Sequence, residues 1–340
     1  MCAQSDESSS VADRISGADS RDADTLGSVG ELAVLARIFP RLPVAASALL
    51  GPGDDSAVVA APDGRFVVTT DMMIEGPDFR LAWSTPHDLG WKAAVSNLAD
   101  VAAMGAVPSA LVVAIAAPSN SPVTLLEGIA DGLRDACTTL APGCGVVGGD
   151  LSVSATLTIA VTAFGDLEGR APVLRSGASA GDIVAVAGVL GESAAALGLL
   201  FSEAVNSDGQ PDAGLAEQLR PRTAAQLAPV PPIAAGRRAA VAGATAMLDL
   251  SDGLAIDSGR LARASGVAID FDSATLGADP ALALAGGEDH SLLATFPPDV
   301  ELAAGFRRIG SCIRGTGLFV DGVPHDSAGW DPYRDWSGVR

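Results

Sequence analysis

The sequence is poor in aromatic and in basic residues, and these shortages exclude several kinds of partner. Phe, Trp and Tyr make up 4% of its 340 residues, and 21 Lys and Arg stand against 41 Asp and Glu, for a formal net charge of −20. Proteins that bind nucleic acid need a basic face that displaces counterions from the phosphates. The composition therefore argues against a nucleic-acid partner and equally against an anionic membrane surface.

Lysine is nearly absent. Lys92 is the only lysine in the chain, and the other side chains of permanent positive charge are all Arg. Genomic codon bias is the simpler explanation, and a specific need for an ammonium group at position 92 is the alternative. The sequence leaves both open.

Cysteine and histidine are also scarce. The four cysteines, Cys2, Cys137, Cys144 and Cys312, form no Cys-x-x-Cys pair, and no Cys/His cluster has the spacing of a zinc site. There is no apolar run of membrane-spanning length and no recognisable signal peptide. We therefore expect a reduced, cytoplasmic protein without a membrane segment.

Apolar residues, by contrast, are abundant and patterned. They form 48% of the chain, as short β-branched runs that alternate with Ala- and Leu-rich helical stretches. This pattern is typical of an α/β (α+β) protein, and the length suits two domains. We expect a disordered tail over residues 1–27, an amino-terminal domain over 28–167 and a carboxyl-terminal domain over 168–340, since the composition shifts to Gly, Arg, Ser and Pro after residue 168.

Turn and capping signals predict where the elements lie. Thr85-Pro86-His87-Asp88 is a capping box with proline at the first helical position, and it opens a helix that runs to about Met104 and stops at Gly105. Further helices are expected at 31–39, 121–140, 192–203, 223–227, 233–242, 255–264 and 281–284. Strands are expected at 57–60, 66–70, 110–116, 145–147, 156–164, 182–187, 246–248, 268–271, 291–295, 306–312 and 317–320, with a polar loop at 206–214.

Six short acidic motifs are spread over most of the chain, each where an apolar run is expected to end or a helix to begin or end. They are Gly53-Asp54-Asp55, Thr69-Thr70-Asp71, Asn97-Leu98-Ala99-Asp100, Gly148-Gly149-Asp150, Asp249-Leu250-Ser251-Asp252-Gly253 and Gly286-Gly287-Glu288-Asp289. Carboxylates that converge in a fold repel one another, and a cation usually compensates that cost. Hard divalent cations with oxygen ligands are the best candidates.

Taken one at a time, these motifs have ordinary structural explanations. Segments such as 53–55 and 148–150 are common Asp- and Gly-rich turns, and Asp71 could cap the next segment. Asn97 and Asp100 share a face of the predicted helix, where a buried carboxylate needs a hydrogen-bond partner or a metal.

The motif at 249–254 is harder to explain structurally. Asp249, Ser251 and Asp252 crowd the first turn of a predicted helix, and an N-cap accounts for only one of them. His290, by contrast, is interpreted as a packed or exposed histidine rather than a ligand. The sequence has no nucleophile elbow, no Walker-type phosphate loop and no dinucleotide fingerprint.

In their joint order, the motifs resemble those of the thiamine-monophosphate kinase family. This family belongs to the ATP-binding superfamily that also contains aminoimidazole ribonucleotide synthetase, selenophosphate synthetase and a hydrogenase maturation dehydratase. The resemblance extends from about Leu26 to Trp336. The segment Asn97–Gly105 followed by Pro108 is its most specific part, and Arg175-Ser176-Gly177 adds to it.

The resemblance implies a two-domain, aminoimidazole ribonucleotide synthetase-like fold in which the amino-terminal sheets of two subunits pair into a barrel. It implies a homodimer that binds ATP and several Mg²⁺ in a cleft between the domains. The implied reaction is a phosphotransfer in which the γ-phosphoryl group of ATP passes directly to the phosphate of thiamine monophosphate, giving thiamine diphosphate and ADP.

The resemblance also implies roles for individual residues. The family's metal positions correspond to Asp55, Thr69, Thr70, Asp71, Asp100, Asp150, Asp249 and Asp252, with Asp71, Asp100, Asp150 and Asp252 as the catalytic carboxylates. Its nucleotide positions correspond to Gly149, Asp150, Arg175 and Ser251, and its substrate positions to Asp78, Glu288 and the aromatic residue Trp330.

Two positions depart from the family pattern. Asp78 stands where the family usually has His, and Ala99 replaces a Ser between Asn97 and Asp100. Two alternatives therefore stay open. One is another synthetase of the superfamily, such as an aminoimidazole ribonucleotide synthetase-like enzyme, and the other is a non-catalytic module that binds a nucleotide or a metal.

Overall fold

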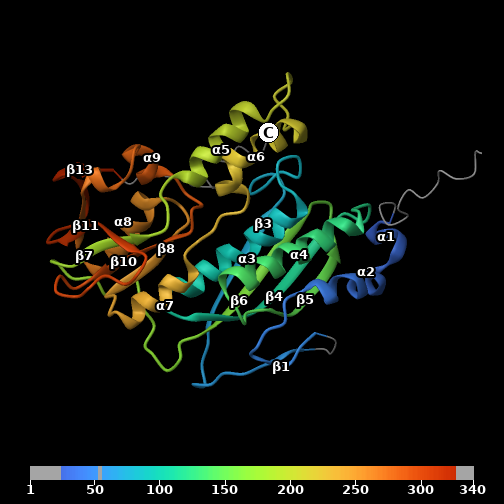
Figure 1. Ribbon diagram of the computed structural model, residues 1–340, viewed down its shortest axis with the longest axis horizontal. Helices are drawn as coiled ribbons and strands as arrows, with labels where there is room; N and C mark the ends of the chain where they lie inside the picture. Colours follow the sequence, from blue (N-terminus) through green and yellow to red (C-terminus); the bar gives the residue numbers. More distant parts are fainter. Residues whose placement is uncertain (1–23, 53–55, 327–340) are drawn as a thin grey trace, which may run out of the picture.

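The computed structural model describes residues 24–52 and 56–326, and it has the mixed α/β architecture that the sequence predicts (Figure 1). A four-stranded and a seven-stranded sheet lie one beyond the other along the long axis. Helix α1 (Leu26–Val29) begins inside the segment expected to be a disordered tail, and residues 1–23 lie outside the described part.

The four-stranded sheet has the order β3-β6-β4-β5, with β4 and β5 parallel and the other pairs antiparallel. Its strands are β3 (Val67–Ile74), β4 (Val107–Ala117), β5 (Val146–Val153) and β6 (Thr158–Asp166). Helices α3 (Pro86–Ala103) and α4 (Val123–Leu140) cover one face. Along β6, Ile159, Val161 and Ala163 are buried under these helices, as the period-two alternation of a strand requires.

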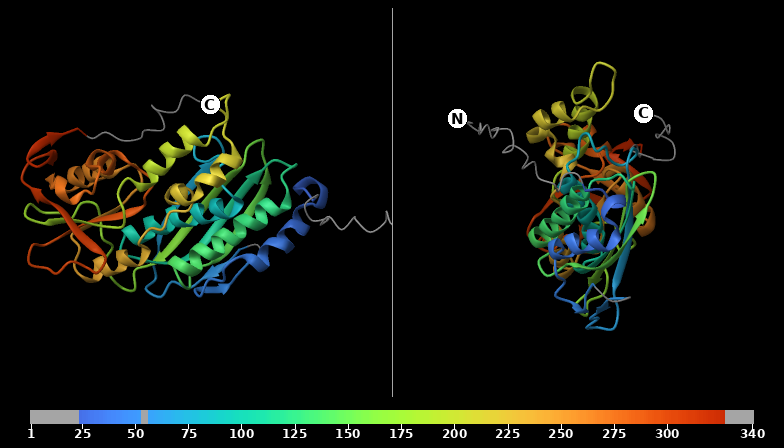
Figure 2. Two further views of the ribbon diagram at one scale, coloured as in Figure 1. Left: turned by 45° about the horizontal axis from the view of Figure 1, so that its top comes forward. Right: turned by 90° about the vertical axis from the view of Figure 1, so that its right-hand side faces the viewer.

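The other face of this sheet is largely open. Val68 and Met72 of β3 point away from the helices and are 60% and 58% exposed. The short strands β1 (Ala48–Leu50) and β2 (Val58–Val59) pack against part of this face through a small apolar cluster. The right-hand view of Figure 2 shows the helices on one side of the sheet. Apolar side chains are therefore exposed to solvent on this face of the sheet.

The seven-stranded sheet has the order β13-β12-β9-β11-β7-β10-β8 and is mixed, because β12 runs parallel to β9. Its strands are β7 (Ile183–Ala187), β8 (Ala246–Leu250), β9 (Ala268–Phe271), β10 (Ser291–Phe296), β11 (Phe306–Ile313), β12 (Gly317–Val320) and β13 (Val323–His325). The helices around it are α5 (Glu192–Glu203), α6 (Ala213–Leu227), α7 (Ile233–Val241), α8 (Leu254–Ser265) and α9 (Pro280–Ala285), with a short 3₁₀ turn, η4 (Ser273–Thr275).

Helix α3 lies at the centre of the molecule and joins the two sheets into one body. One apolar cluster contains residues of α3 and α4 together with Ala185, Met247 and Leu292 of the second sheet. The opposite face of that sheet packs against α8 through a separate cluster that includes Val184 and Leu248. Groups on α3 are therefore held rigidly against both sheets.

The capping box that the sequence predicts is present at the start of α3. Thr85 Oγ1 accepts a hydrogen bond from Asp88 N (3.2 Å), and Asp88 Oδ2 accepts one from Thr85 N (2.8 Å). Arg220 of α6 also pairs with Asp88, at 2.5 Å. The first turn of α3 is thereby tied to the carboxyl-terminal half of the chain.

Three predicted boundaries are wrong. β3 continues to Ile74, so Thr69-Thr70-Asp71 lies in the middle of a strand rather than at its end. Likewise, 148–150 lies within β5 and not after it. Helix α6 starts at Ala213 instead of residue 223, because Asp212 caps it and Pro221 is accommodated inside it. Polar or glycine-rich sequence predicts a break in all three cases, whereas pairing with neighbouring strands extends β3 and β5 and the Asp212 cap extends α6.

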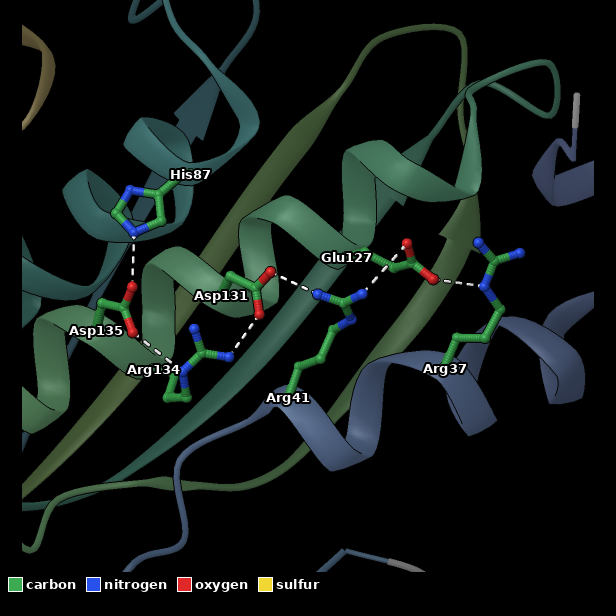
Figure 3. Close-up of polar contacts among 7 residues, drawn as sticks. All are labelled: Arg37, Arg41, His87, Glu127, Asp131, Arg134 and Asp135. Atoms are coloured by element: carbon green, nitrogen blue, oxygen red, sulfur yellow. Dashed lines mark hydrogen bonds and ion pairs between the residues drawn. The ribbon is translucent and has the colours of Figure 1, made fainter. Parts of the chain in front are cut away.

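The amino-terminal segment is attached to α4 by ion pairs (Figure 3). Arg37 of α2 (Glu31–Ile38) contacts Glu127 at 2.5 Å, and Arg41 of the 3₁₀ turn η3 (Phe39–Arg41) contacts Asp131 at 2.5 Å. The chain of pairs continues through Arg134 and Asp135 to His87 of α3. Within the described ranges, no helix is both long and apolar enough to cross a membrane.

Candidate active site

An acidic cluster lies where β3 meets α3. Thr69 and Asp71 point toward α3, on the same face as the buried Met73. Thr69 Oγ1 donates a hydrogen bond to Asp100 Oδ2 (2.7 Å), and the backbone N–H of Asp71 donates to Asn97 Oδ1 (3.1 Å). The predicted shared face of Asn97 and Asp100 is thus the face that meets the strand.

The second sheet contributes two more groups to this cluster. Asp249 of β8 is 5% exposed and faces the same core as its neighbour Met247. His290 is 7% exposed, and its Nδ1 lies 3.2 Å from Asp249 Oδ2. Of the two alternatives for His290, packed or exposed, the structure shows a buried side chain, and it adds a polar partner, Asp249.

Because these groups lie close together, they shift one another's pKa values. Burial, together with the charges of Asp249 and Asp71, raises the pKa of Asp100 to about 7. Burial also raises the pKa of Asp71. Burial alone would lower the pKa of His290, but its hydrogen bond to Asp249 and that carboxylate's charge outweigh burial and raise it. The cluster thus contains more carboxyl groups than positively charged groups that could neutralise them, which favours a bound cation.

A second polar cluster surrounds Lys92 on the same helix. Lys92 Nζ lies 3.2 Å from Glu288 Oε2, which also accepts a hydrogen bond from Gln226 Nε2. Asp78 is close enough for both Glu288 and Lys92 to act on it, although burial is the main cause of its raised pKa. Asp78 Oδ2 also accepts a hydrogen bond from Ile74 N (2.7 Å), so this residue shapes the turn after β3.

The two clusters are connected along α3. Lys92, Ser96 and Asp100 follow each other at intervals of four, so they form one stripe on the helix. Eight residues of α-helix separate Lys92 from Asp100 by about 12 Å. The charges of Lys92 and Glu288, as well as that of Asp249, act on the pKa of His290. The stripe therefore offers an acidic end and an ammonium–carboxylate end within one elongated site.

Asp252 belongs to a neighbouring group whose other members, Asp257 and Arg260, are in none of the acidic motifs. Arg260 Nη1 contacts Asp252 Oδ2 at 2.5 Å and Asp257 Oδ1 at 2.7 Å, and Asp252 N donates to Asp257 Oδ2. Burial raises the pKa of Asp257 to about 6, with contributions from Asp252 and Asp249. Asp257 therefore links Asp252 electrostatically to the acidic cluster.

Two predicted metal positions lie on the opposite face of the four-stranded sheet. Thr70 alternates with Thr69 and Asp71, and its hydroxyl donates to the carbonyl of Val161 at 2.9 Å. Asp150 is paired in register with Ala114, which faces away from the helices, and its carboxylate accepts a hydrogen bond from Ser152 (2.7 Å). The sheet therefore separates these two side chains from the acidic cluster.

The predicted nucleotide positions are scattered. At Gly149, a Cβ atom would lie 1.9 Å from Val113 O, so strand pairing alone requires a glycine there. Arg175 is exposed next to a cavity of about 480 Å³ that Ser176 and Thr245 line with the segment 170–174. Ser251 accepts the backbone N–H of Glu288 through its carbonyl. Two further predicted residues, Asp55 and Trp330, lie outside the described residues.

The described residues contain no group of three or more His, Cys, Asp and Glu side chains arranged to hold a metal ion. The expectation of one cage formed by all the acidic motifs is therefore not met by residues 24–52 and 56–326. The physical reason is strand alternation, which directs neighbouring residues of one motif to opposite faces. What the fold does bring together is the set Asp71, Asp100 and Asp249, with the donors around them.

Several residues of the site escaped the sequence analysis. Gln226, Asp257 and Arg260 belong to no motif, and only the tertiary fold places them beside motif residues. Lys92 had one signal, its uniqueness in the chain. The spacing of Asp257 and Arg260, three residues apart on a predicted helix, was a second signal that could have indicated their pairing.

Comparison with known proteins gives consistent relatives. Residues 53–167 match the family described as AIR synthase related protein, N-terminal domain. The thiamine-monophosphate kinase of Mycobacterium tuberculosis is 43% identical over 331 residues, which cover 93% of each chain. A solved structure of AaThiL complexed with AMPPCP and TMP is 33% identical over 82% of this chain and 90% of that chain, with a TM-score of 0.67. The thiamine-monophosphate kinase of Stenotrophomonas maltophilia is 31% identical over 86% of this chain and 96% of that chain, with a TM-score of 0.70.

Proposed function

The chain belongs to the thiamine-monophosphate kinase family, and from that premise we propose that it catalyses the ATP-dependent phosphorylation of thiamine monophosphate. The γ-phosphoryl group leaves the bridging oxygen of ATP and bonds to a phosphate oxygen of the acceptor. The products are ADP and thiamine diphosphate. The observation that carries the proposal is the convergence of Asp71, Asp100 and Asp249 in a chain with these relatives.

The chemistry explains why such a site is acidic although both reactants are anions. An acceptor phosphate is already ionised, so no strong base is needed to activate it. The barrier lies in bringing negative groups together in line. Carboxylates that hold Mg²⁺ would screen that repulsion and orient the phosphate oxygens.

Asp71, Asp100 and Asp249 are not arranged to hold a metal ion by themselves within the described residues. We propose that they hold Mg²⁺ together with Thr69 once Asp55 and Asp252 complete the ligand set. The donors fit the ion, because all are hard oxygen donors and two of the carboxyl groups have raised pKa values. A bound cation would remove the energetic cost of ionising these two carboxyl groups.

The remaining assignments follow the family pattern. We propose that Arg175 and Ser251 contact the nucleotide, and that Glu288 and Trp330 contact the thiamine half of the acceptor. Asp78 lies beside Glu288, which supports a place near the acceptor, while its hydrogen bond to Ile74 supports a structural role in the turn. Because Thr70 and Asp150 are on the open face of the sheet and Gly149 precedes Asp150 in β5, their roles depend on what covers that face.

At larger scale, we propose two domains that divide near residue 168, between β6 and β7, with the site between them. We propose that the open face of the four-stranded sheet pairs with a second copy, since its apolar residues otherwise face water. Because the reaction uses ATP, we place it in the cytoplasm.

The proposal is tested by incubating the protein with ATP, Mg²⁺ and thiamine monophosphate. We expect thiamine diphosphate and ADP to form in equal amounts, with no phosphorylated protein during turnover. Binding of ATP without any thiamine diphosphate would instead indicate a non-catalytic module. A trapped phosphoryl-protein would contradict direct transfer while leaving the overall reaction intact.

A further inference from the structure

Lys92 makes an unusual contact across the middle of the molecule. It lies on α3, is 7% exposed, and pairs with Glu288 of the loop that precedes β10. Most other ion pairs of the described residues use arginine at partly exposed positions, such as Arg222 with Glu203. A buried lysine is costly unless it has a specific partner, so this contact calls for an explanation beyond codon bias.

The loop that carries Glu288 is held in a strained conformation. Glu288 and His290 have φ values of +63° and +51°, which non-glycine residues rarely adopt. Their backbone N–H groups donate to Ser251 O (2.8 Å) and Leu250 O (3.0 Å). Between them, the Asp289 carboxylate accepts hydrogen bonds from two backbone N–H groups at the start of α5. The surrounding structure thus fixes the Glu288 backbone and leaves its side chain to be positioned separately.

The side chain of Glu288 is positioned through one oxygen only. Oε2 receives both Lys92 Nζ and Gln226 Nε2, and Gln226 is itself fixed by Ser193 Oγ. Within the described ranges, no residue donates to Oε1. The side chain of Glu288 as a whole is about four-tenths exposed, and its second oxygen has no donor among the described residues, which leaves that oxygen available to a ligand.

We propose that Lys92 is a positioning residue, whose ammonium group fixes Glu288 so that its free oxygen accepts a hydrogen bond from the aminopyrimidine end of the acceptor. This inference rests on the proposed function. The spacing along α3 supports it, because Lys92 lies about 12 Å from Asp100. An acceptor that extends along the helix with its phosphate at the Asp100 end has its ring system toward Lys92.

Electrostatics supports the same role. Burial alone would raise the pKa of Glu288, but the charge of Lys92 and the hydrogen bond from Gln226 lower it, so the carboxylate stays ionised. A point charge on a flexible stem suits this task, since it can neutralise Glu288 while occupying a single carboxylate oxygen. Arginine would tend to bind both oxygens in a bidentate manner and block the open one.

The test is a mutant cycle on the full-length protein with steady-state kinetics. Lys92→Met is expected to raise the KM for thiamine monophosphate by about tenfold or more, as for the loss of a hydrogen bond to a charged group, with the KM for ATP changed less than about twofold. Glu288→Gln is expected to raise the same KM. Because Lys92 acts through Glu288, adding Lys92→Met to Glu288→Gln should have almost no further effect.

Two controls separate positioning from general stability. Arg222→Met removes an exposed cation paired with Glu203 and should leave both KM values unchanged. Lys92→Arg keeps the charge, so its stability should be closer to wild type than that of Lys92→Met. Its KM for thiamine monophosphate should nevertheless stay raised. Should Lys92→Met not fold, Lys92→Gln replaces it, since it retains a hydrogen-bond donor. An unchanged KM for thiamine monophosphate, equal increases in both KM values, or multiplicative effects in the double variant would each overturn the proposal.

Failure of the proposed function would be recognised first, by wild-type protein that forms no thiamine diphosphate. Titration calorimetry with thiamine monophosphate then replaces kinetics. Wild-type binding that weakens in Lys92→Met but not further in the double variant would support the positioning role on its own. Absence of wild-type binding would overturn both proposals.

Discussion

At the scale of single residues, Asp100 shows that ionising carboxyl groups placed close together is unfavourable when no cation is bound. Burial and two neighbouring carboxylates raise its pKa from 3.8 to about 7. Between these pH values the folded protein keeps a proton that the unfolded chain releases. The stabilising contribution of this group is therefore complete below about pH 4 and is lost as the pH rises toward about 7.

The matching prediction concerns Asp100→Asn in the absence of divalent cations. Asparagine has no proton to lose and can still accept the hydrogen bond from Thr69. We expect the variant to gain stability relative to wild type as the pH is raised from about 5 to about 8, by an amount on the order of 1 kcal/mol or more. Urea unfolding of both proteins in EDTA across this range measures it. A stability difference that is independent of pH would contradict the assignment.

Asp71 provides the corresponding prediction for activity. It faces Asp100 and the second sheet from the middle of β3, and burial raises its pKa. We expect Asp71→Asn to reduce kcat by about 100-fold or more, because a ligand that stabilises the transferred phosphoryl group is lost. The circular dichroism spectrum and Tm should stay near those of wild type. Loss of the folded spectrum would make Asp71 structural instead.

At the scale of elements, the contact between α3 and α4 depends on a missing side chain. A Cβ atom on Gly90 would lie 1.9 Å from Ile129 O of α4, and this backbone atom cannot move away as a flexible side chain could. We expect Gly90→Ala to destabilise the protein by about 3 kcal/mol or more, since α4 must move away from α3, the helix that carries Lys92 and Asp100.

Gly198 of α5 is the matched control for that substitution. A Cβ atom there meets nothing within 4 Å, so alanine costs no packing and improves helix propensity. We expect Gly198→Ala to stabilise the protein by about 0.5–1 kcal/mol. Chemical denaturation of both variants measures the contrast. Similar effects of the two substitutions would contradict the close packing of α3 on α4.

How far the sequence predicts these elements depends on the kind of signal. The start of α3 was predictable, because the capping box at Thr85 is local chemistry that acts wherever the chain is placed. The extension of β3 to Ile74 was not, since it depends on pairing with β6, far along the chain. The start of α6 at Ala213 was not predictable for a different reason, because Pro221 is locally a helix-breaking residue although the helix accommodates it.

At the scale of the whole molecule, motif order identified the family but not the geometry of the site. Asp71, Asp100 and Asp249 could be named from sequence, because each lies in a motif that the family shares. The side on which Asp150 lies could not, since a strand residue changes faces with a shift of one position. Single residues such as Gln226 enter the site only through the packing of α6 beside the loop that carries Glu288.

The open face of the four-stranded sheet carries the last prediction, which concerns assembly. Val68 and Met72 lie on this face of β3, on either side of Thr70, and are each more than half exposed. We propose that a second copy covers them, and a charged residue buried in that contact would be costly. We therefore expect Val68→Asp and Met72→Asp to shift the protein from dimer to monomer in sedimentation-velocity experiments at the same concentration.

Leu32 supplies the control for this experiment. It is 83% exposed on α2, which packs against α4 and not against the open face, so Leu32→Asp adds the same charge to a surface that we do not assign to the contact. This variant should sediment like wild type. The activity of the two open-face variants is informative as well, because Asp150 lies on the same side of the sheet and its proposed role depends on what covers it. A wild-type monomer, or dimers that persist in both variants, would contradict the pairing of the two sheets.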